Sequence, residues 1–214
     1  MNFIGHATVA LWHSHDGARV LGSMLPDFAG MARTRLSRSV QPDEGQQLAA
    51  VREGIALHHR TDEVFHATPI FVSLQQETLD ALVAQGIPRG AARAVAHVGT
   101  EMFIDGELVR ASEVAEAYTR ALNVGDGLSP LFADAEGAAR WELLRQRLIV
   151  YGAPYDYGDP ESVLRRLSMV LRGRPRLAID DRALPILRQA LPGLQRKVVD
   201  QLSALLSAIR VHLS

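Results

Sequence analysis

The chain has 214 residues with 23 basic and 24 acidic side chains, so its net charge of −1 predicts no general attraction to nucleic acid or anionic membranes. It contains no cysteine, which excludes disulfides and thiolate metal ligands. No apolar run reaches the roughly 20 residues of a membrane-spanning helix, and the start lacks the pattern of a secretory signal. We therefore expect a cytoplasmic protein without nucleic-acid or membrane partners.

Apolar residues recur three and four apart along the chain, among many Ala, Leu and Arg, whereas alternating β-branched runs are missing. This pattern predicts an all-α protein, a compact multi-helix domain. In chain order, we expect helices over 6–13, 17–32, 47–67, 70–85, 91–105, 112–124, 134–150, 160–172 and 181–213. Residues 33–46 should form a surface loop that carries Arg33, Arg35 and Arg38.

Proline and glycine suggest where these helices end. Pro69 should end the helix over 47–67 and Gly106 should end the one over 91–105, while Ser112 is a candidate N-cap. We also expect Pro185 and Pro192 to interrupt the last helix.

We predict one helical domain over residues 1–214. Seven of the eight histidines lie in the first half, about 1–108, which should hold the chemistry. The second half, about 109–214, contains only His212 and should supply packing and substrate contacts.

Two sets of polar residues repeat at helical spacing. His58, Asp62 and His66 are four residues apart, and residues four apart lie one above the other on a helix. Imidazole and carboxylate groups together can bind a divalent transition metal or act as acid and base beside one. The alternative is a buried Asp–His hydrogen-bond network that pins helices together.

His97, Glu101 and Asp105 repeat the same spacing. Together with His6 and Asp27 upstream, these two sets of polar residues predict one site assembled from several helices. Alternatively, the acids from Asp105 onwards form a solvated helix end.

Four segments of the first half occur in an order that resembles a known family. They are 1–6 (MNFIGH), 21–28 (LGSMLPDF), 54–62 (GIALHHRTD) and 101–104 (EMFI). The family is that of the acyl carrier protein phosphodiesterases. Its members are all-helical and similar to the HD-type metal phosphohydrolases. They hydrolyse the phosphodiester between 4′-phosphopantetheine and a serine of acyl carrier protein, with a divalent cation, preferentially manganese.

The resemblance implies that four residues of this chain match the family's metal-site positions, namely His6, Asp27, His58 and Asp62. It also implies that Arg60 matches an arginine of the family's His-Arg-Arg segment. The chain departs from the family where Ser23 replaces Asn, His59 replaces Arg, His66 replaces Asp, and Glu101-Met102 replaces Asp-His.

Residues and resemblance together give the hypothesis of a divalent-metal-dependent phosphodiesterase or phosphohydrolase, with Mn²⁺ implied by the resemblance. The expected metal ligands are His6, Asp27, His58, Asp62 and Glu101. The expected catalytic residues are Arg60, His59, His66 and His97. Arg60 would stabilise the phosphoryl charge, and a histidine would orient water or protonate the leaving oxygen.

The substrate or partner would be acyl carrier protein or a small phosphodiester. The alternative is a non-catalytic helical binding or scaffold protein that keeps the family fold. The replacements at Glu101 and Met102 favour this alternative, because Met102 cannot replace a histidine at a hard metal.

Overall fold

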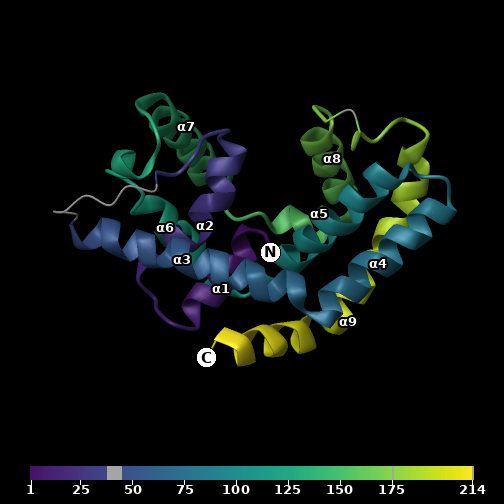
Figure 1. Cartoon of the computed structure of the whole chain (residues 1–214), viewed down its shortest axis with the longest axis horizontal. Coiled ribbons are helices and arrows are strands. Elements are labelled where there is room, and N and C mark those ends of the chain that lie inside the picture. The colour runs from purple at the N-terminus through teal and green to yellow at the C-terminus, as the bar shows by residue number, and fades with distance from the viewer. Residues whose placement is uncertain (38–44, 175, 214) are drawn as a thin grey trace. The chain divides into compact units, whose positions relative to one another are not determined.

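The computed structural model describes residues 1–37, 45–174 and 176–213, and over these ranges it is built of α-helices and two short 3-10 helices without a strand (Figure 1). The all-α prediction is confirmed. The helices are α1 (Phe3–Leu11), α2 (Gly17–Met31), α3 (Gln46–Ala67), α4 (Pro69–Ala84), α5 (Arg89–Leu108), α6 (Ser112–Asn123), η1 (Ser129–Leu131), α7 (Ala135–Tyr151), η2 (Tyr155–Gly158), α8 (Pro160–Leu171) and α9 (Ala183–Leu213).

The chain divides into two compact units, each made of two separate segments. The first unit combines residues 1–62 with 108–154, and the second combines 63–107 with 155–214. One boundary between the units falls between Glu107 and Leu108. Each unit nevertheless takes residues from both predicted halves.

Helix α1 is the centre of the first unit. All residues from Phe3 to Ala10 are buried, and the helix packs against α2 and α6. Aromatic rings fill the space between these helices: Phe3 lies 5.3 Å from Phe28 and 6.0 Å from Tyr118, measured between ring centroids. Because α1 is buried on nearly all sides, any polar side chain that it carries must find its partners inside the protein.

In the second unit, α9 runs beside α4 and also contacts α8 (Figure 1). Helix α5 approaches η2 at Gly106, where an added Cβ would lie 2.4 Å from the backbone of Tyr157. The prediction that Gly106 ends its helix is therefore wrong, since α5 continues to Leu108. Gly106 is required by close packing rather than by a turn.

Two other predictions about helix ends need correction. Pro192 lies within α9, which continues unbroken over 31 residues, and Pro185 falls in its first turns. A proline close to a helix start costs little, because the first N–H groups have no helical partner. Ser112 is the first residue of α6, and its N-cap is Ala111.

Pro69 occupies the expected place. It ends α3 and begins α4, whose N-cap Thr68 accepts a hydrogen bond of 3.3 Å from the backbone N–H of Phe71. Of the predicted loop over 33–46, residues 38–44, including Arg38, lie outside the described residues. Before them, Leu36 forms an isolated antiparallel bridge with Phe132.

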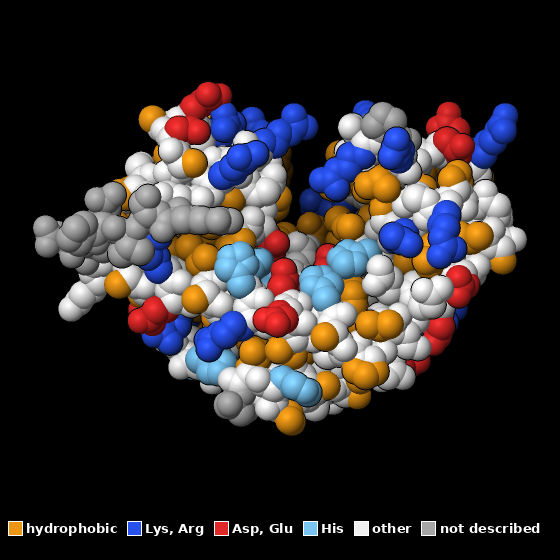
Figure 2. Space-filling model, in the orientation of Figure 1, with side chains coloured by type: hydrophobic (Ala, Val, Ile, Leu, Met, Phe, Trp, Pro, Cys, Tyr) orange, Lys and Arg blue, Asp and Glu red, His pale blue; other side chains and the backbone are white. Residues whose placement is uncertain are grey.

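Charged and hydrophobic side chains are interspersed on the face drawn in Figure 2. Within the described ranges, no helix has the length and apolar character needed to cross a membrane.

Candidate metal centre

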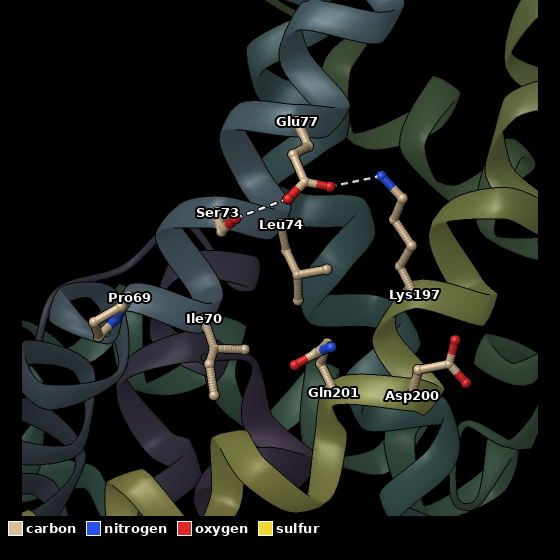
Figure 3. A pocket seen from close by; sticks show the side chains of 8 residues that line it. All are labelled: Pro69, Ile70, Ser73, Leu74, Glu77, Lys197, Asp200 and Gln201. Carbon is tan, nitrogen blue, oxygen red and sulfur yellow. Dashed lines mark hydrogen bonds and ion pairs between the residues drawn. The ribbon is translucent and has the colours of Figure 1, made fainter.

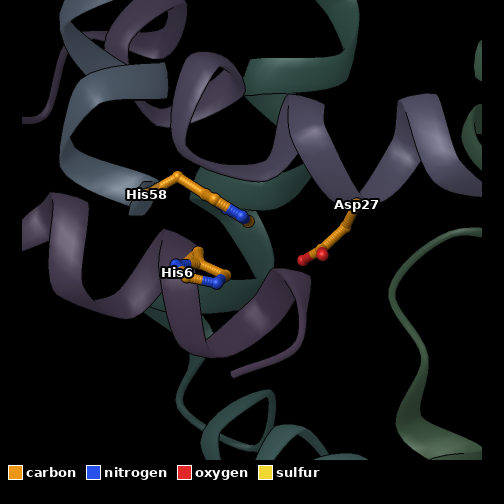
Figure 4. Close-up of side chains that lie close together, drawn as sticks. All are labelled: His6, Asp27 and His58. Atoms are coloured by element: carbon orange, nitrogen blue, oxygen red, sulfur yellow. The ribbon is translucent and has the colours of Figure 1, made fainter. Parts of the chain in front are cut away.

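Three helices of the first unit bring potential ligands together. His6 comes from α1, Asp27 from α2 and His58 from α3 (Figure 4). Each offers one donor atom, and these three atoms lie within 4.8 Å of one another. Both histidines are buried and Asp27 is half-buried. The structure thus brings together three of the five residues that the sequence suggests as ligands.

Two glycines allow α2 and α3 to approach closely enough for this arrangement. A Cβ on Gly22 would lie 2.0 Å from the carbonyl oxygen of Val51, and a Cβ on Gly54 would lie 2.1 Å from that of Arg19. Any side chain at either position would push the helices apart. Gly54 precedes His58 by about one helical turn, so the close contact fixes the helix that carries this ligand.

Ser23 follows Gly22 and connects all three helices. Its carbonyl oxygen accepts a 2.8 Å hydrogen bond from Nδ1 of His58, and its hydroxyl donates to the carbonyl oxygens of Val20 (2.7 Å) and His6 (3.2 Å). Since a carbonyl can only accept, Nδ1 of His58 carries the proton. The lone pair of His58 therefore resides on Nε2, the tautomer that binds a metal through that atom.

The ring of His6 stacks on the ring of His58, with centroids 3.8 Å apart and planes inclined by 27°. Two positively charged imidazolium rings would repel each other in this arrangement. Burial, followed by the proximity of His6, lowers the pKa of His58 to about 3. Burial likewise lowers the pKa of His6, despite the nearby Asp62 carboxylate. Both rings are neutral at pH 7, as metal ligation requires.

Asp62 borders the same cluster. Its Oδ1 lies 3.2 Å from Nε2 of His6, and its Oδ2 lies 3.6 Å from Nε2 of His58. The Met1 ammonium donates a 2.7 Å hydrogen bond to Oδ1. Burial opposes ionisation of Asp62, but His6 and the ammonium outweigh it and hold the pKa of the carboxyl well below its usual range. Asp62 is therefore a carboxylate that faces both histidines.

These donors fit a divalent transition metal. Two imidazoles and a carboxylate, with no thiolate, are typical of sites for Mn, Fe, Co, Ni or Zn. Both ring nitrogens of His6 are buried, and neither makes a hydrogen bond of good geometry within the described part of the chain. Buried polar atoms ordinarily have a partner, and a bound cation would provide one for the ring of His6, whose Nε2 otherwise lies 3.2 Å from the Asp62 carboxylate.

A second cluster of potential ligands lies in the other unit. Glu101 Oε1 is 3.3 Å from Nε2 of His66 and 3.3 Å from Nε2 of His97. Burial raises the pKa of Glu101, but the two histidines lower this pKa by more than burial raises it. The pKa of Glu101 therefore lies well below its usual value. The sequence suggests Glu101 as a ligand of the same metal as His6. The contacts that the structure gives it are with His66 and His97.

Two predicted catalytic residues are exposed on α3. The ring of His59 packs edge-on against His58, with centroids 5.3 Å apart. Arg60 follows His58 by two residues, which is ~200° around a helix. Helical geometry therefore gives no support for a contact between Arg60 and a phosphate bound at the cluster.

Asp105 is fully buried inside α5. The alternative of a solvated helix end at this position is therefore wrong. The burial follows from the continuation of α5 through Gly106, which keeps Asp105 within the packed part of the unit.

The structure also contains a pocket that we did not predict from the sequence. It has a volume of about 380 Å³ and lies between α4 and α9, above the apolar side chains of Ile70 and Leu74 (Figure 3). An ion pair spans it, with Lys197 Nζ 2.7 Å from Glu77 Oε2, and Ser73 donates to the other oxygen of Glu77 at 2.8 Å. The four-residue spacing of Ser73 and Glu77 is the only sequence signal for this rim.

Comparisons with known protein families, with curated proteins and with solved structures found no match for this chain.

Proposed function

We propose that this chain is a divalent-metal-dependent phosphodiester hydrolase whose metal is held by His6, Asp27 and His58. The observation that carries the proposal is the convergence of these three side chains from three helices, with their donor atoms within 4.8 Å. A buried pair of stacked neutral imidazoles beside two carboxylates is costly to maintain in a core, unless it binds something.

The residues around the cluster have distinct roles in this proposal. Ser23 holds His58 in the tautomer that presents Nε2. Asp62 faces both imidazoles and would balance the positive charge of a cation. A bound divalent cation would supply Lewis acidity, which polarises phosphoryl oxygens and makes water a better nucleophile at neutral pH.

We assign proton transfer to His59. It is the exposed imidazole that packs against His58. Its ring could hold a proton for the leaving oxygen. We do not retain Arg60 as a phosphate ligand, because it lies on the other side of α3.

The first test is metal content and turnover. Protein purified without chelator and supplied with Mn²⁺ should retain metal after gel filtration and hydrolyse bis-p-nitrophenyl phosphate. His58→Ala should lose both properties, and circular dichroism should still report a helical protein. His13→Ala is the matched control, since His13 is exposed in the same unit.

The substrate proposal rests on the resemblance to the acyl carrier protein phosphodiesterases. Incubation of holo acyl carrier protein with the chain and Mn²⁺ should yield the apo carrier and free 4′-phosphopantetheine, which mass spectrometry detects. Cleavage of the small phosphodiester alone would retain the chemistry and reject this substrate. Absence of both metal and turnover would favour the non-catalytic helical binding protein.

A further inference from the structure

The second cluster has the geometry of a metal site in its own right. His97 and Glu101 are one turn apart on α5, and His66 comes from the C-terminal part of α3. All three offer a donor atom within 4.8 Å of the others. The set shares no residue with the first cluster, and all its members belong to the second unit.

We propose that His66, His97 and Glu101 form a second divalent-metal site, which takes a four-coordinate transition metal such as Zn²⁺ or Co²⁺. This inference goes beyond the proposed function, because it concerns a different unit and different ligands.

Nε2 of His66 and Oε1 of Glu101 are within hydrogen-bonding distance, and the spacing of the cluster also suits ligands of one shared cation. Charge-assisted hydrogen bonds between imidazole and carboxylate have lengths of about 2.7–2.9 Å. Both nitrogens here are 3.3 Å from the same oxygen, Oε1 of Glu101. In a tetrahedral site with bonds of about 2.0–2.1 Å, neighbouring ligand atoms are ~3.3–3.4 Å apart. The two observed nitrogen–oxygen distances match two edges of such a tetrahedron.

The orientation of the rings is consistent with this spacing. His66 and His97 stack with centroids 5.1 Å apart and planes inclined by 10°, and the Nε2 atom of each lies 3.3 Å from the Glu101 carboxylate. The buried Phe71 packs edge-on against both rings, with centroids 5.3 Å away in each case. This aromatic wall limits how the imidazoles can turn and holds the ligands in place before any metal binds.

Exposure shows where further ligands would enter. The side chains of both histidines are 35% exposed, whereas that of Glu101 is 13% exposed. A site of two histidines and one glutamate leaves a fourth position for water or an anionic group, as in catalytic zinc sites. The half-exposed imidazoles place that position towards solvent.

The types of ligand atom determine which metal ions the site would prefer. Two imidazoles favour Zn²⁺, Co²⁺ or Ni²⁺ over Mg²⁺ and Ca²⁺, which prefer oxygen donors. The first cluster offers a similar set of donors, so an experiment must separate the two sites by variants rather than by metal identity.

The test is Co²⁺ stoichiometry of the full chain, by equilibrium dialysis and by visible absorption, which is intense for four-coordinate Co²⁺. The wild type should bind two equivalents. Glu101→Gln should bind one, and so should His58→Ala, while the double variant should bind none. Loss of a residue that only orients a metal ligand weakens metal binding about 10–100-fold, so removal of a ligand itself should raise the Kd at the second site more than ~100-fold.

His97→Asn provides an independent variant in case Glu101→Gln does not fold, and His212→Ala controls for binding by exposed histidines. Equal stoichiometry and absorption in the wild type, Glu101→Gln and His97→Asn would overturn the second site. A single equivalent that Glu101→Gln removes but His58→Ala retains would support the second site and reject the first. The reverse result would reject the second site and leave the proposed function standing.

Discussion

The Nδ1 proton of His58 is donated to the main-chain oxygen of Ser23, 35 positions earlier in the sequence, at 2.8 Å. This single contact ties α3 to α2 and selects the tautomer of a proposed ligand. Because the acceptor is a backbone atom, the bond depends on the separation of the two helices rather than on the side chain at position 23. Mutations that move the helices should therefore affect the metal centre without touching a ligand.

The first prediction concerns that helix separation. Gly54→Ala would place a Cβ 2.1 Å from the carbonyl oxygen of Arg19, so α3 must shift away from α2. We expect a loss of about 1–3 kcal/mol in the free energy of unfolding from overpacking. Affinity for Mn²⁺, measured by isothermal titration calorimetry, should fall as well.

The matched control for Gly54→Ala is Gly30→Ala in α2. A Cβ on Gly30 meets nothing within 4 Å, and the position is exposed. This variant should leave Mn²⁺ affinity unchanged and should stabilise the protein by up to about 1 kcal/mol in urea unfolding. If Gly54→Ala binds Mn²⁺ as the wild type does, the helix contact does not position His58.

A second prediction concerns Asp62, which faces both histidines of the first cluster. Asp62→Asn keeps the shape and removes the negative charge, so Mn²⁺ affinity should fall at least ~10-fold, with a parallel loss of turnover. Circular dichroism should remain helical. Glu63→Gln removes one charge from the next, exposed residue and should change neither quantity. Equal losses in both variants would point to a general charge effect and not to a role of Asp62.

The third prediction tests a buried arginine that has no sequence signal. Arg145 is 5% exposed, donates 2.9 Å to the carbonyl oxygen of Leu122 and forms a bidentate pair with Glu142 at 2.7 and 2.8 Å. Arg145→Met would leave the carbonyl and the half-exposed carboxylate without these partners. We expect a loss of about 1–3 kcal/mol in urea unfolding.

Arg147 lies two residues later on the same helix and is exposed, so Arg147→Met is the control. It should change the free energy of unfolding by less than about 0.5 kcal/mol. A similar effect of both substitutions would show that the ion pair of Arg145 contributes nothing specific.

The fourth prediction concerns pH. Asp159 is the N-cap of α8, and hydrogen bonds from the hydroxyl (2.6 Å) and the backbone N–H (2.9 Å) of Ser162 lower its pKa. Because the folded pKa is below the unfolded value of about 3.9, the stabilisation is fully present above that value. It is lost as the pH falls through the folded pKa.

Asp159→Asn keeps an acceptor oxygen at the cap and removes the titration. Urea unfolding between pH 2 and 6 (a range set by ~2 units either side of the Asp value) should therefore show the wild type losing stability relative to this variant below about pH 4. Parallel stability curves for the two proteins would exclude Asp159 as the titrating group.

The sequence predicted most helices, because apolar periodicity and Pro69 are local signals. It also predicted the convergence of His6, Asp27 and His58, which the structure brings together. It could not predict the partner of His58, since the acceptor is a main-chain atom on another helix. Gly106 was misread for a similar reason: its requirement comes from Tyr157, far along the chain, and not from a local turn.

The four-residue spacing showed which polar residues share a helix face. It could not show which of them belong to the same metal site. Asp62 and His66 are adjacent on one face of α3, yet Asp62 contacts His6 and His66 contacts Glu101. The helices that pack against each part of α3 decide which cluster a residue of that part belongs to. That information is tertiary, so one predicted site became two clusters.

The interleaved order of the two units has a consequence for synthesis on the ribosome. His6, Asp27, His58 and Asp62 all leave the ribosome among the first 62 residues, but α6 and α7, which complete their unit, end only at Tyr151. The second unit's segment from 63 to 107 emerges in between and must wait still longer, for α8 and α9. Nascent chains that extend beyond Asp62 but end before Ser112 therefore carry every proposed ligand of the first cluster before α6, which packs against α1 and α2, has been made.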